Sequence, residues 1–297
     1  MKKRIFTGCA TALITPFTPD GNDVDYKAFE KLLSFQLEND IDALVVAGTT
    51  GESPVLTKEE KLQLIKKACE FSCGKIPVIA GTGSNNTSEA VKKSNDSEKQ
   101  GVDGLLIVTP YYNKCTQEGL IDHYFYIADR VSTPIIVYNV PSRTGVNISS
   151  ETYKALSEHK NIVAVKEAGG NISEFAKTSV LCRDNLDFYS GNDDQTLPMM
   201  ALGAKGVISV VSNIIPHEMK LLTQACIDSN FDEGRNVHEK YLKLMNTMFC
   251  EVNPIPVKSA CNILYGFSKS LRLPLTSISS ENEKIIEQLL RNYNMIK

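Results

Sequence analysis

Two short apolar runs, Pro134-Ile-Ile-Val-Tyr138 and Ile162-Val-Ala-Val-Lys166, show the pattern that decides the fold of this chain. Neither run alternates apolar with polar residues, which is typical of strands buried on both faces of a parallel sheet. Stretches with helical spacing separate these runs from their neighbours along the chain. Six similar runs lie at residues 9–14, 43–47, 76–80, 104–108, 186–189 and 206–210. Eight strands alternating with helices predict an α/β fold, a (β/α)8 TIM barrel.

Length and composition agree with one large folded unit. The 297 residues, 42% of them hydrophobic, are enough to bury the core of a barrel of about 250 residues with additions. A formal net charge of −3 lacks the basic excess that is typical of nucleic-acid-binding proteins. No apolar run approaches the roughly 18 residues that span a bilayer, and the N-terminal segment is too polar for a signal peptide. The eight scattered cysteines, without a C-x-x-C pair, favour reduced thiols and a cytoplasmic protein.

Helix signals divide the chain into two parts. Thr57-Lys-Glu-Glu60 is a capping box, and Asn86 or Thr87 can cap the next helix. Strand signals stop at about residue 230, and the pattern is helical from there on. We therefore expect a barrel with the active site over residues 1–229 and a C-terminal helical extension over 230–297. The pattern leaves open whether the extension caps the barrel or forms an oligomer contact.

Lys166 is the first candidate for chemistry, because active sites of such barrels lie at the C-terminal ends of the strands. It follows four apolar residues, so burial should lower its pKa and supply a neutral amine. Such an amine is the nucleophile that Schiff-base formation with a ketone requires. The alternative is a structural lysine that snorkels to solvent or pairs with Glu167.

Other polar groups are expected at the same end of the barrel. Tyr138 ends the fifth run and can move protons, and Arg143 behind it can bind a carboxylate. Their alternatives are an amphipathic rim residue and a surface charge. The loop Gly48-Thr-Thr-Gly-Glu-Ser53 offers hydroxyl donors, although an ordinary tight turn has a similar composition.

Several motifs are missing from the sequence. None of the four histidines ends an expected strand or belongs to an H-x-H or H-E-x-x-H pair, which disfavours a metal-dependent aldolase or hydrolase. Neither a complete dinucleotide fingerprint nor a P-loop is present. The acidic loop at 191–194 stands where phosphate-binding barrels hold their anion, which favours an unphosphorylated substrate. We expect no metal and no nucleotide cofactor.

Three motifs on the expected strands two, five and six carry a resemblance: Gly48-Thr-Thr-Gly-Glu52, Tyr138-Asn-Val-Pro-Ser-Arg-Thr-Gly145 and Val165-Lys-Glu167. They resemble the class I pyruvate-dependent aldolases, and within them the dihydrodipicolinate synthase family. The resemblance covers nearly the whole chain, including Thr109-Pro-Tyr-Tyr-Asn113 and Asn253-Pro-Ile-Pro-Val-Lys258. N-acetylneuraminate lyases and 2-keto-3-deoxy sugar-acid aldolases are similar in the glycine-threonine loop and the lysine, but not generally in an arginine placed like Arg143.

The resemblance implies a lyase that condenses pyruvate with L-aspartate 4-semialdehyde to 4-hydroxy-tetrahydrodipicolinate, the first committed step toward diaminopimelate and lysine. Lys166 would form a covalent imine with pyruvate, with no other cofactor. Tyr138 would move protons through Thr49 and Tyr112, and Tyr112 would reach in from a neighbouring subunit. The family therefore implies a homo-oligomer, a tetramer built from dimers.

The same resemblance assigns the substrate contacts. Thr50, Gly191 and Ile208 would hold pyruvate, and Arg143 would orient the carboxylate of the aldehyde. Two alternatives stay open: another pyruvate aldolase of the kinds named above, or a pyruvate-binding barrel without catalytic activity.

Some members of the family bind L-lysine as an inhibitor near the residues that match Ser53, Asn85, Glu89 and Tyr111. Lys58 and Lys61 stand here where sensitive members have histidines. Because two cations would repel a cationic ligand, we expect weak or absent inhibition. If both side chains turn into solvent, inhibition would survive.

Overall fold

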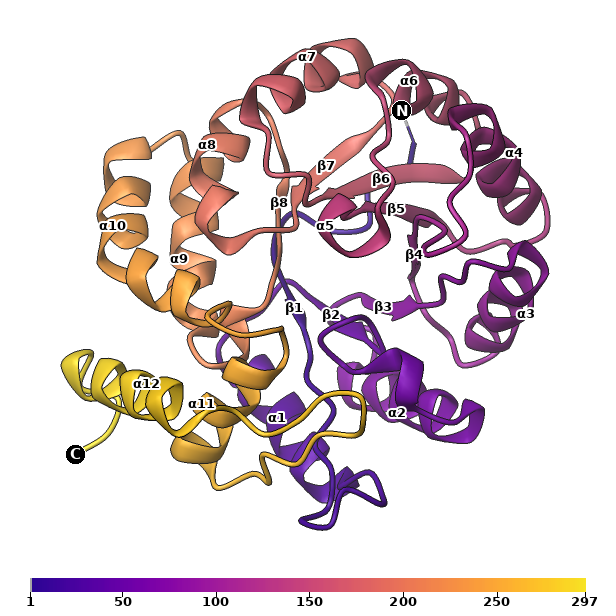
Figure 1. Ribbon diagram of the computed structural model, residues 1–297. Helices are drawn as coiled ribbons and strands as arrows, with labels where there is room; N and C mark the ends of the chain where they lie inside the picture. Colours follow the sequence, from indigo (N-terminus) through magenta and orange to yellow (C-terminus); the bar gives the residue numbers. More distant parts are fainter. Residues whose placement is uncertain (1) are drawn as a thin grey trace.

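The computed structural model describes residues 2–297 and contains a closed barrel of eight parallel strands inside a ring of helices (Figure 1). The strands follow one another in chain order, and the last pairs with the first. This confirms the predicted (β/α)8 barrel. The strands are β1 (Gly8–Ala12), β2 (Ala43–Val46), β3 (Val78–Gly81), β4 (Gly104–Val108), β5 (Ile135–Asn139), β6 (Ile162–Glu167), β7 (Asp187–Ser190) and β8 (Gly206–Ser209).

Each barrel strand is followed by at least one helical segment. The α-helices are α1 (Tyr26–Glu38), α2 (Lys58–Ser72), α3 (Thr87–Glu98), α4 (Gln117–Ala128), α5 (Pro141–Thr144), α6 (Ser150–Ser157), α7 (Ile172–Cys182), α8 (Thr196–Ala201), α9 (Pro216–Ile227), α10 (Phe231–Thr247), α11 (Ile255–Tyr265) and α12 (Ser280–Asn292). Short 3-10 helices are η1 (Ser53–Val55), η2 (Asp193–Gln195) and η3 (Val211–Asn213). The predicted capping box is present at the start of α2, and Asn86 caps α3.

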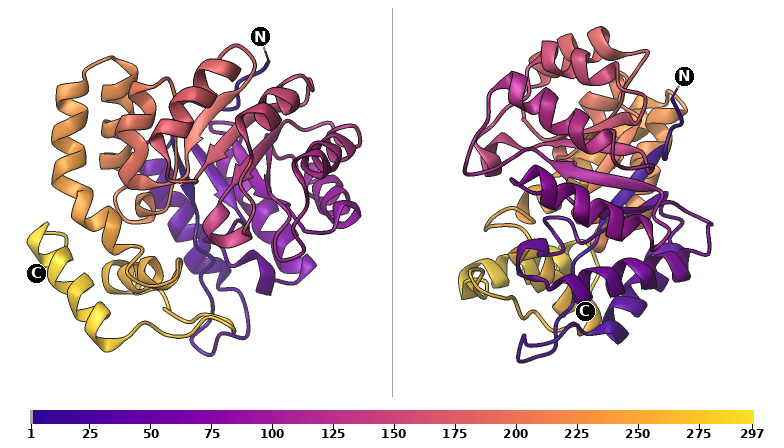
Figure 2. Two further views of the ribbon diagram at one scale, coloured as in Figure 1. Left: turned by 45° about the horizontal axis from the view of Figure 1, so that its top comes forward. Right: turned by 90° about the vertical axis from the view of Figure 1, so that its right-hand side faces the viewer.

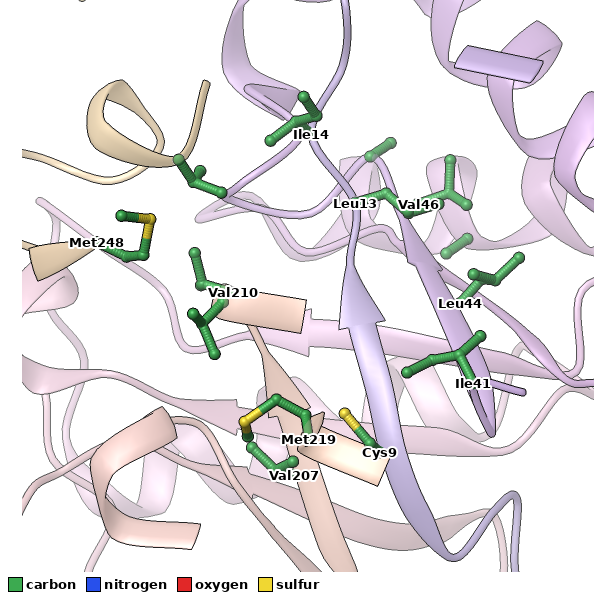
Figure 3. Packing of buried hydrophobic residues seen from close by; sticks show 14 of the residues in the cluster. Cys9, Leu13, Ile14, Ile41, Leu44, Val46, Val207, Val210, Met219 and Met248 are labelled. Atoms are coloured by element: carbon green, nitrogen blue, oxygen red, sulfur yellow. The ribbon is translucent and has the colours of Figure 1, made fainter. Parts of the chain in front are cut away.

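The apolar side chains form two layers. The outer layer fills the space between the strands and the helices, where Figure 3 shows Cys9, Val207 and Met219 packed together. The inner layer fills the barrel itself and includes Tyr138 and Ile208. Strands with apolar residues on both faces therefore lack alternation, as their sequences indicated. Side chains at alternate positions of a strand point into the barrel, and this places Lys166 on the same face as Ala164 of the inner layer.

Closure between β1 and β8 depends on a close approach of two glycines. A Cβ on Gly206 would lie 1.8 Å from the carbonyl oxygen of Gly8, so the strands could not pair at this point with any larger residue. Below this point the ring of Phe6 stacks on Tyr189 with a centroid distance of 4.1 Å, and the Tyr189 hydroxyl donates to the Phe6 carbonyl. The N-terminal end of the barrel is thereby closed by aromatic side chains.

The chain after α9 is helical, with α10 packed beside α9 and α11 beside α12 on one side of the barrel (Figure 2). The segments around α11 reach back to the loop after β2, where they make the contacts described below. Within residues 2–297, no helix has the length and apolar character needed to span a membrane.

Candidate active site

A cavity of about 260 Å³ opens at the C-terminal end of the barrel strands. Thr49, Tyr138 and Arg143 line it, so the structure brings together three predicted residues from two separate motifs. The cavity continues toward α2 and α3, where Ser53 and Tyr111 contribute to its wall. This is the end of the barrel at which TIM-barrel enzymes carry their active sites.

Lys166 lies next to this cavity as a buried lysine. It pairs in register with Tyr138 across β5 and β6, only 5% of it is exposed, and its Nζ lies 4.4 Å from the centroid of the Tyr138 ring. Burial lowers the pKa of Lys166 to about 8, with a smaller rise from Asp193 and a smaller lowering from Arg143. About one-tenth of such amines are neutral at pH 7. The expected burial and lowered pKa are both present.

Glu167 is not the partner of Lys166. It lies on the opposite face of β6, where its carboxylate accepts hydrogen bonds from the Tyr153 hydroxyl at 2.6 Å, the Asn139 amide at 3.1 Å and the backbone N–H of Gly169 at 2.6 Å. These donors occupy both carboxylate oxygens. The alternative of a structural Lys166–Glu167 ion pair is therefore wrong.

Tyr138 is poised as a proton donor. Burial raises the pKa of its phenol, while the charge of Arg143 and a hydrogen bond with Thr49 lower it by less. The phenol is therefore protonated at neutral pH. Its position between Thr49 and the ammonium of Lys166 suits the passage of protons to and from groups bound near Lys166.

The loop after β2 is held by residues far away in the sequence. The Asn253 amide donates to the Thr50 hydroxyl at 3.0 Å, and Arg143 donates to the Asn253 carbonyl at 3.2 Å. Glu52, in a left-handed conformation with φ of 54°, accepts a hydrogen bond from Lys258 at 2.7 Å. The side chains of this ion pair are 1% and 0% exposed. Neither Asn253 nor Lys258 was predicted as a site residue, although both lie in a motif that carries the family resemblance.

Gly191 and Ile208 belong to the neighbouring β7–β8 part of the barrel. The backbone of Gly191 passes so close that a Cβ there would lie 3.1 Å from Cε of Lys166, and its N–H donates to the Glu167 carbonyl at 2.7 Å. Ile208 is fully buried in the inner layer and pairs in register with Ala10. The glycine allows the loop after β7 to pack directly on the lysine side chain.

Tyr112 stands apart from this cluster in the single chain. It is 92% exposed and adopts a left-handed conformation with φ of 67°. Such a conformation is strained for a tyrosine and is common where a side chain is held out for function. The structure of one chain does not bring Tyr112 to Lys166, and its predicted role stays a prediction.

The region of the predicted lysine site differs in part from expectation. Ser53 and Tyr111 line the cavity, and Asn85 donates to the Tyr111 carbonyl at 3.2 Å. Glu89 does not line it and lies exposed, 3.8 Å from Lys92.

The expectation that both Lys58 and Lys61 face this site is wrong for Lys58. Lys58 forms an ion pair with Asp96 at 2.5 Å on the surface between α2 and α3, because the turn of α2 directs it toward that carboxylate. Lys61 does line the cavity, and Lys93 of α3 lines it as well. Burial and the charge of Lys93 lower the pKa of Lys61. Lys93 was missed because its contact with this wall depends on how two helices pack.

Among the described residues 2–297, no cluster of three or more His, Cys, Asp or Glu side chains could hold a metal ion. The groups gathered at the cavity are an amine, a phenol, hydroxyls and a guanidinium. These groups suit nucleophilic attack on a carbonyl, proton transfer and carboxylate binding.

Comparison with known proteins identifies the family. The model of the dihydrodipicolinate synthetase family matches residues 5–293. The chain is 48% identical to 4-hydroxy-tetrahydrodipicolinate synthase 1 of Clostridium acetobutylicum over 293 residues, covering 99% of both chains.

Two solved structures are similar over nearly the full length. Dihydrodipicolinate synthase from Aquifex aeolicus has 47% identity and a TM-score of 0.94, with 98% of this chain and 99% of that chain covered. The chloride-inhibited dihydrodipicolinate synthase from Acinetobacter baumannii, complexed with pyruvate, has 39% identity and a TM-score of 0.96, covering 99% and 100%. A family match over 5–293 and a shared fold lead to one conclusion: this chain belongs to the dihydrodipicolinate synthetase family.

Proposed function

We propose that this chain is a 4-hydroxy-tetrahydrodipicolinate synthase, a Schiff-base lyase that condenses pyruvate with L-aspartate 4-semialdehyde. This reaction is the first committed step toward diaminopimelate and lysine. The observation that carries the proposal is Lys166, a buried amine with a pKa of about 8 beside Tyr138 in the barrel of this family. The names of the relatives supply the product and pyruvate, and the family resemblance supplies aspartate semialdehyde as the second substrate.

The reaction begins at the lysine. The neutral amine of Lys166 attacks the ketone carbon of pyruvate, and loss of water leaves an iminium ion. The iminium withdraws electrons from the adjacent methyl group, which loses a proton to give an enamine. The enamine carbon then attacks the aldehyde carbon of aspartate semialdehyde, whose oxygen takes up a proton. The amino group of the bound intermediate finally attacks the imine carbon, closes the ring and releases Lys166.

Tyr138 and Thr49 serve these steps as a proton path. The protonated phenol of Tyr138 can donate to the departing water and to the aldehyde oxygen, and Thr49 receives and returns its proton. Tyr112 of a neighbouring subunit completes the path. Its exposure in a single chain supports a contact with another copy, in a homo-oligomer that we propose to be a tetramer built from dimers.

The substrates are held by their carboxylates. Thr50, together with the backbone at Gly191 and Ile208, binds pyruvate, and Asn253 fixes the Thr50 hydroxyl for this contact. Arg143 lines the cavity and offers a guanidinium to the carboxylate of the aldehyde. Lys166 as an imine is the only covalent group that the chemistry needs, and no metal or added cofactor takes part in the proposal.

The experiment that tests the activity is a substrate comparison with purified protein. We expect condensation of pyruvate with aspartate semialdehyde, and no cleavage of N-acetylneuraminate or a 2-keto-3-deoxy sugar acid. Arg143→Ala should raise KM for the aldehyde at least about tenfold, because one charge-assisted contact is lost, and leave imine formation with pyruvate largely intact. Arg183→Ala, on an exposed helix end, is the control. Cleavage of a sugar acid without use of aspartate semialdehyde would support the alternative aldolase.

Regulation by L-lysine is expected to be weak or absent. Lys61 and Lys93 both line the outer part of the cavity near Ser53 and Tyr111, so a cationic ligand would meet two like charges there. Each such contact costs on the order of 1 kcal/mol or more, about a tenfold loss of affinity. A titration of the initial rate with L-lysine tests this expectation. Half-inhibition at a lysine concentration below about 1 mM would contradict weak or absent regulation.

A further inference from the structure

A second buried charge lies close to Lys166 on the β7–β8 side of the barrel. Asp193, the first residue of η2, is 2% exposed. Its Oδ2 accepts hydrogen bonds from the backbone N–H groups of Val210 and Val211, at 3.1 and 2.9 Å. Its Oδ1 is buried and has no hydrogen-bond partner among residues 2–297. A buried carboxyl oxygen without a hydrogen-bond donor is uncommon in proteins.

The loop that carries Asp193 packs directly on the lysine. Two residues before Asp193, the backbone of Gly191 approaches Lys166 so closely that a Cβ would lie 3.1 Å from Cε. Within the described part of the chain, Nζ of Lys166 has no hydrogen bond or ion pair of its own, and it lies over the ring of Tyr138. Two charged side chains act on it from different elements, Asp193 from η2 and Arg143 from α5.

Glu167, the other carboxylate near Lys166, is not available to balance the charge of the lysine. Glu167 is adjacent to Lys166 in the sequence, but it points to the opposite face of β6 and is bound by Tyr153, Asn139 and the backbone of Gly169. Asp193 is the carboxylate whose charge reaches the lysine. Lys166 and Asp193 are both buried, and they do not form a direct ion pair; the carboxylate acts on the amine through its charge alone.

Imine formation makes a counter-charge necessary. When the neutral amine reacts with a ketone, it becomes an iminium ion with a fixed positive charge on a lysine that is only 5% exposed. An uncompensated charge in such a place is costly, and a nearby buried anion offsets that cost. The iminium must also stay positively charged to withdraw electrons from the adjacent carbon.

We propose that Asp193 is a positioning residue that acts through Lys166, as the buried counter-charge of its iminium ion. The inference rests on the proposed function, because it concerns the imine that Lys166 forms there. Oδ2 is fixed by two backbone amides, so the carboxylate supplies charge without being free to swing in and take the proton that leaves the methyl group. That proton is left to Tyr138.

Burial and the nearby donors act in opposite directions on the charge of Asp193, and burial has the larger effect. Burial raises its pKa, while Ser209, the two backbone amides and Lys166 act in the opposite direction. Burial, with a smaller effect of the charge of Asp193, holds the pKa of the Cys9 thiol in β1 well above its usual value, so the thiol stays neutral. The charge of Arg143 lowers the pKa of Lys166 and the charge of Asp193 raises it, so Asp193 is the neighbour that favours a positive charge on the lysine.

The test uses Asp193→Asn, which keeps the size of the side chain and an oxygen that can accept from both amides but removes the charge. Asp194→Asn is the matched control, because it removes the same charge from the next residue, which is exposed. The full-length protein is incubated with pyruvate from pH 6 to 10, reduced with borohydride, and the adduct on Lys166 is quantified by mass spectrometry.

We expect two changes in Asp193→Asn. The pyruvate concentration for half-maximal trapping should rise at least about tenfold, because the iminium has lost its counter-charge. The pH midpoint of the trapping rate should fall by about one unit, because the amine also loses the anion that favours its protonated form. Asp194→Asn should match the wild type in both measurements. A merely structural defect would lower the amount of active protein without moving the pH midpoint.

Asp193→Ser is a second variant, with a hydroxyl for the amides and less bulk, and circular dichroism shows which variants are folded. A folded variant that keeps the wild-type pyruvate dependence and pH midpoint overturns the role of Asp193. An absence of any adduct in the wild type overturns the proposed function instead. If the wild type forms the adduct but does not condense aspartate semialdehyde, the assigned substrate is wrong. The role of Asp193 is still tested in that case, by the pyruvate dependence and the pH midpoint of trapping.

Discussion

Lys166 follows four apolar residues in β6, and burial is the main reason that its pKa is about 8. The protonated amine is not a nucleophile, so the rate of imine formation should rise with pH through this value and level off above it. Trapping rates with pyruvate and borohydride between pH 6 and 10 check this. A rate that is already constant from pH 6, or that rises only near pH 10.5 as for an exposed lysine, would contradict the lowered pKa.

Residue-scale prediction from the sequence succeeded where the cause is local. The burial of Lys166 and Tyr138 follows from the apolar runs that they end, because both faces of those strands are covered. The hydrogen-bond partners of the site residues could not be predicted from the sequence. Asn253 bonds to Thr50 across 203 positions of the chain, and Asp193 accepts from Val210 and Val211 17 and 18 positions away, so neither contact leaves a periodic signal.

At the scale of elements, α11 holds the loop between β2 and α2 through the buried Glu52–Lys258 ion pair. Lys258→Met should lower the free energy of unfolding by about 3–5 kcal/mol, because it leaves Glu52 as a buried charge without its cation. Chemical denaturation measures this difference. Adding Glu52→Gln should recover part of the lost free energy of unfolding.

Lys66→Met is the control. It removes an exposed lysine 3.8 Å from Glu70, and its free energy of unfolding should stay within about 0.5 kcal/mol of the wild type. If Lys258→Met and Lys66→Met changed the free energy of unfolding equally, burial would not be the reason that the Glu52–Lys258 ion pair matters.

Element boundaries show why most of the barrel was predictable. All eight apolar runs became strands, and the capping box at Thr57 starts α2 as expected. The third strand begins two residues later than its run at 76–80, since Pro77 has no N–H for the ladder and contributes only its carbonyl, to Leu44. The helices after residue 230 were also expected. Their packing partners were not, because periodicity identifies an apolar face but not what covers it.

At the scale of the whole molecule, Tyr112 links activity to assembly. It is exposed in the single chain and is proposed to reach the active site of a neighbouring subunit. Tyr112→Phe removes only the hydroxyl and should lower kcat at least about tenfold, with a smaller effect on KM, because a proton-transfer group is lost. Tyr126→Phe, on an exposed face of α4, is the control and should be fully active.

Sedimentation in parallel tests the assembly itself. We expect an oligomer, and both tyrosine variants should sediment as the wild type does. A fully active monomer would contradict the shared site, since no second copy would then supply Tyr112.

The central claim is that Lys166 forms an imine with pyruvate, and borohydride reduction followed by peptide mass spectrometry tests it most directly. Lys258 is an internal control, because it is also buried but is held by Glu52 at 2.7 Å. The account predicts one reduced pyruvate adduct per chain, on Lys166, with none on Lys258 and none in Lys166→Arg. The absence of an adduct in the folded protein, or an adduct on another lysine, would contradict it.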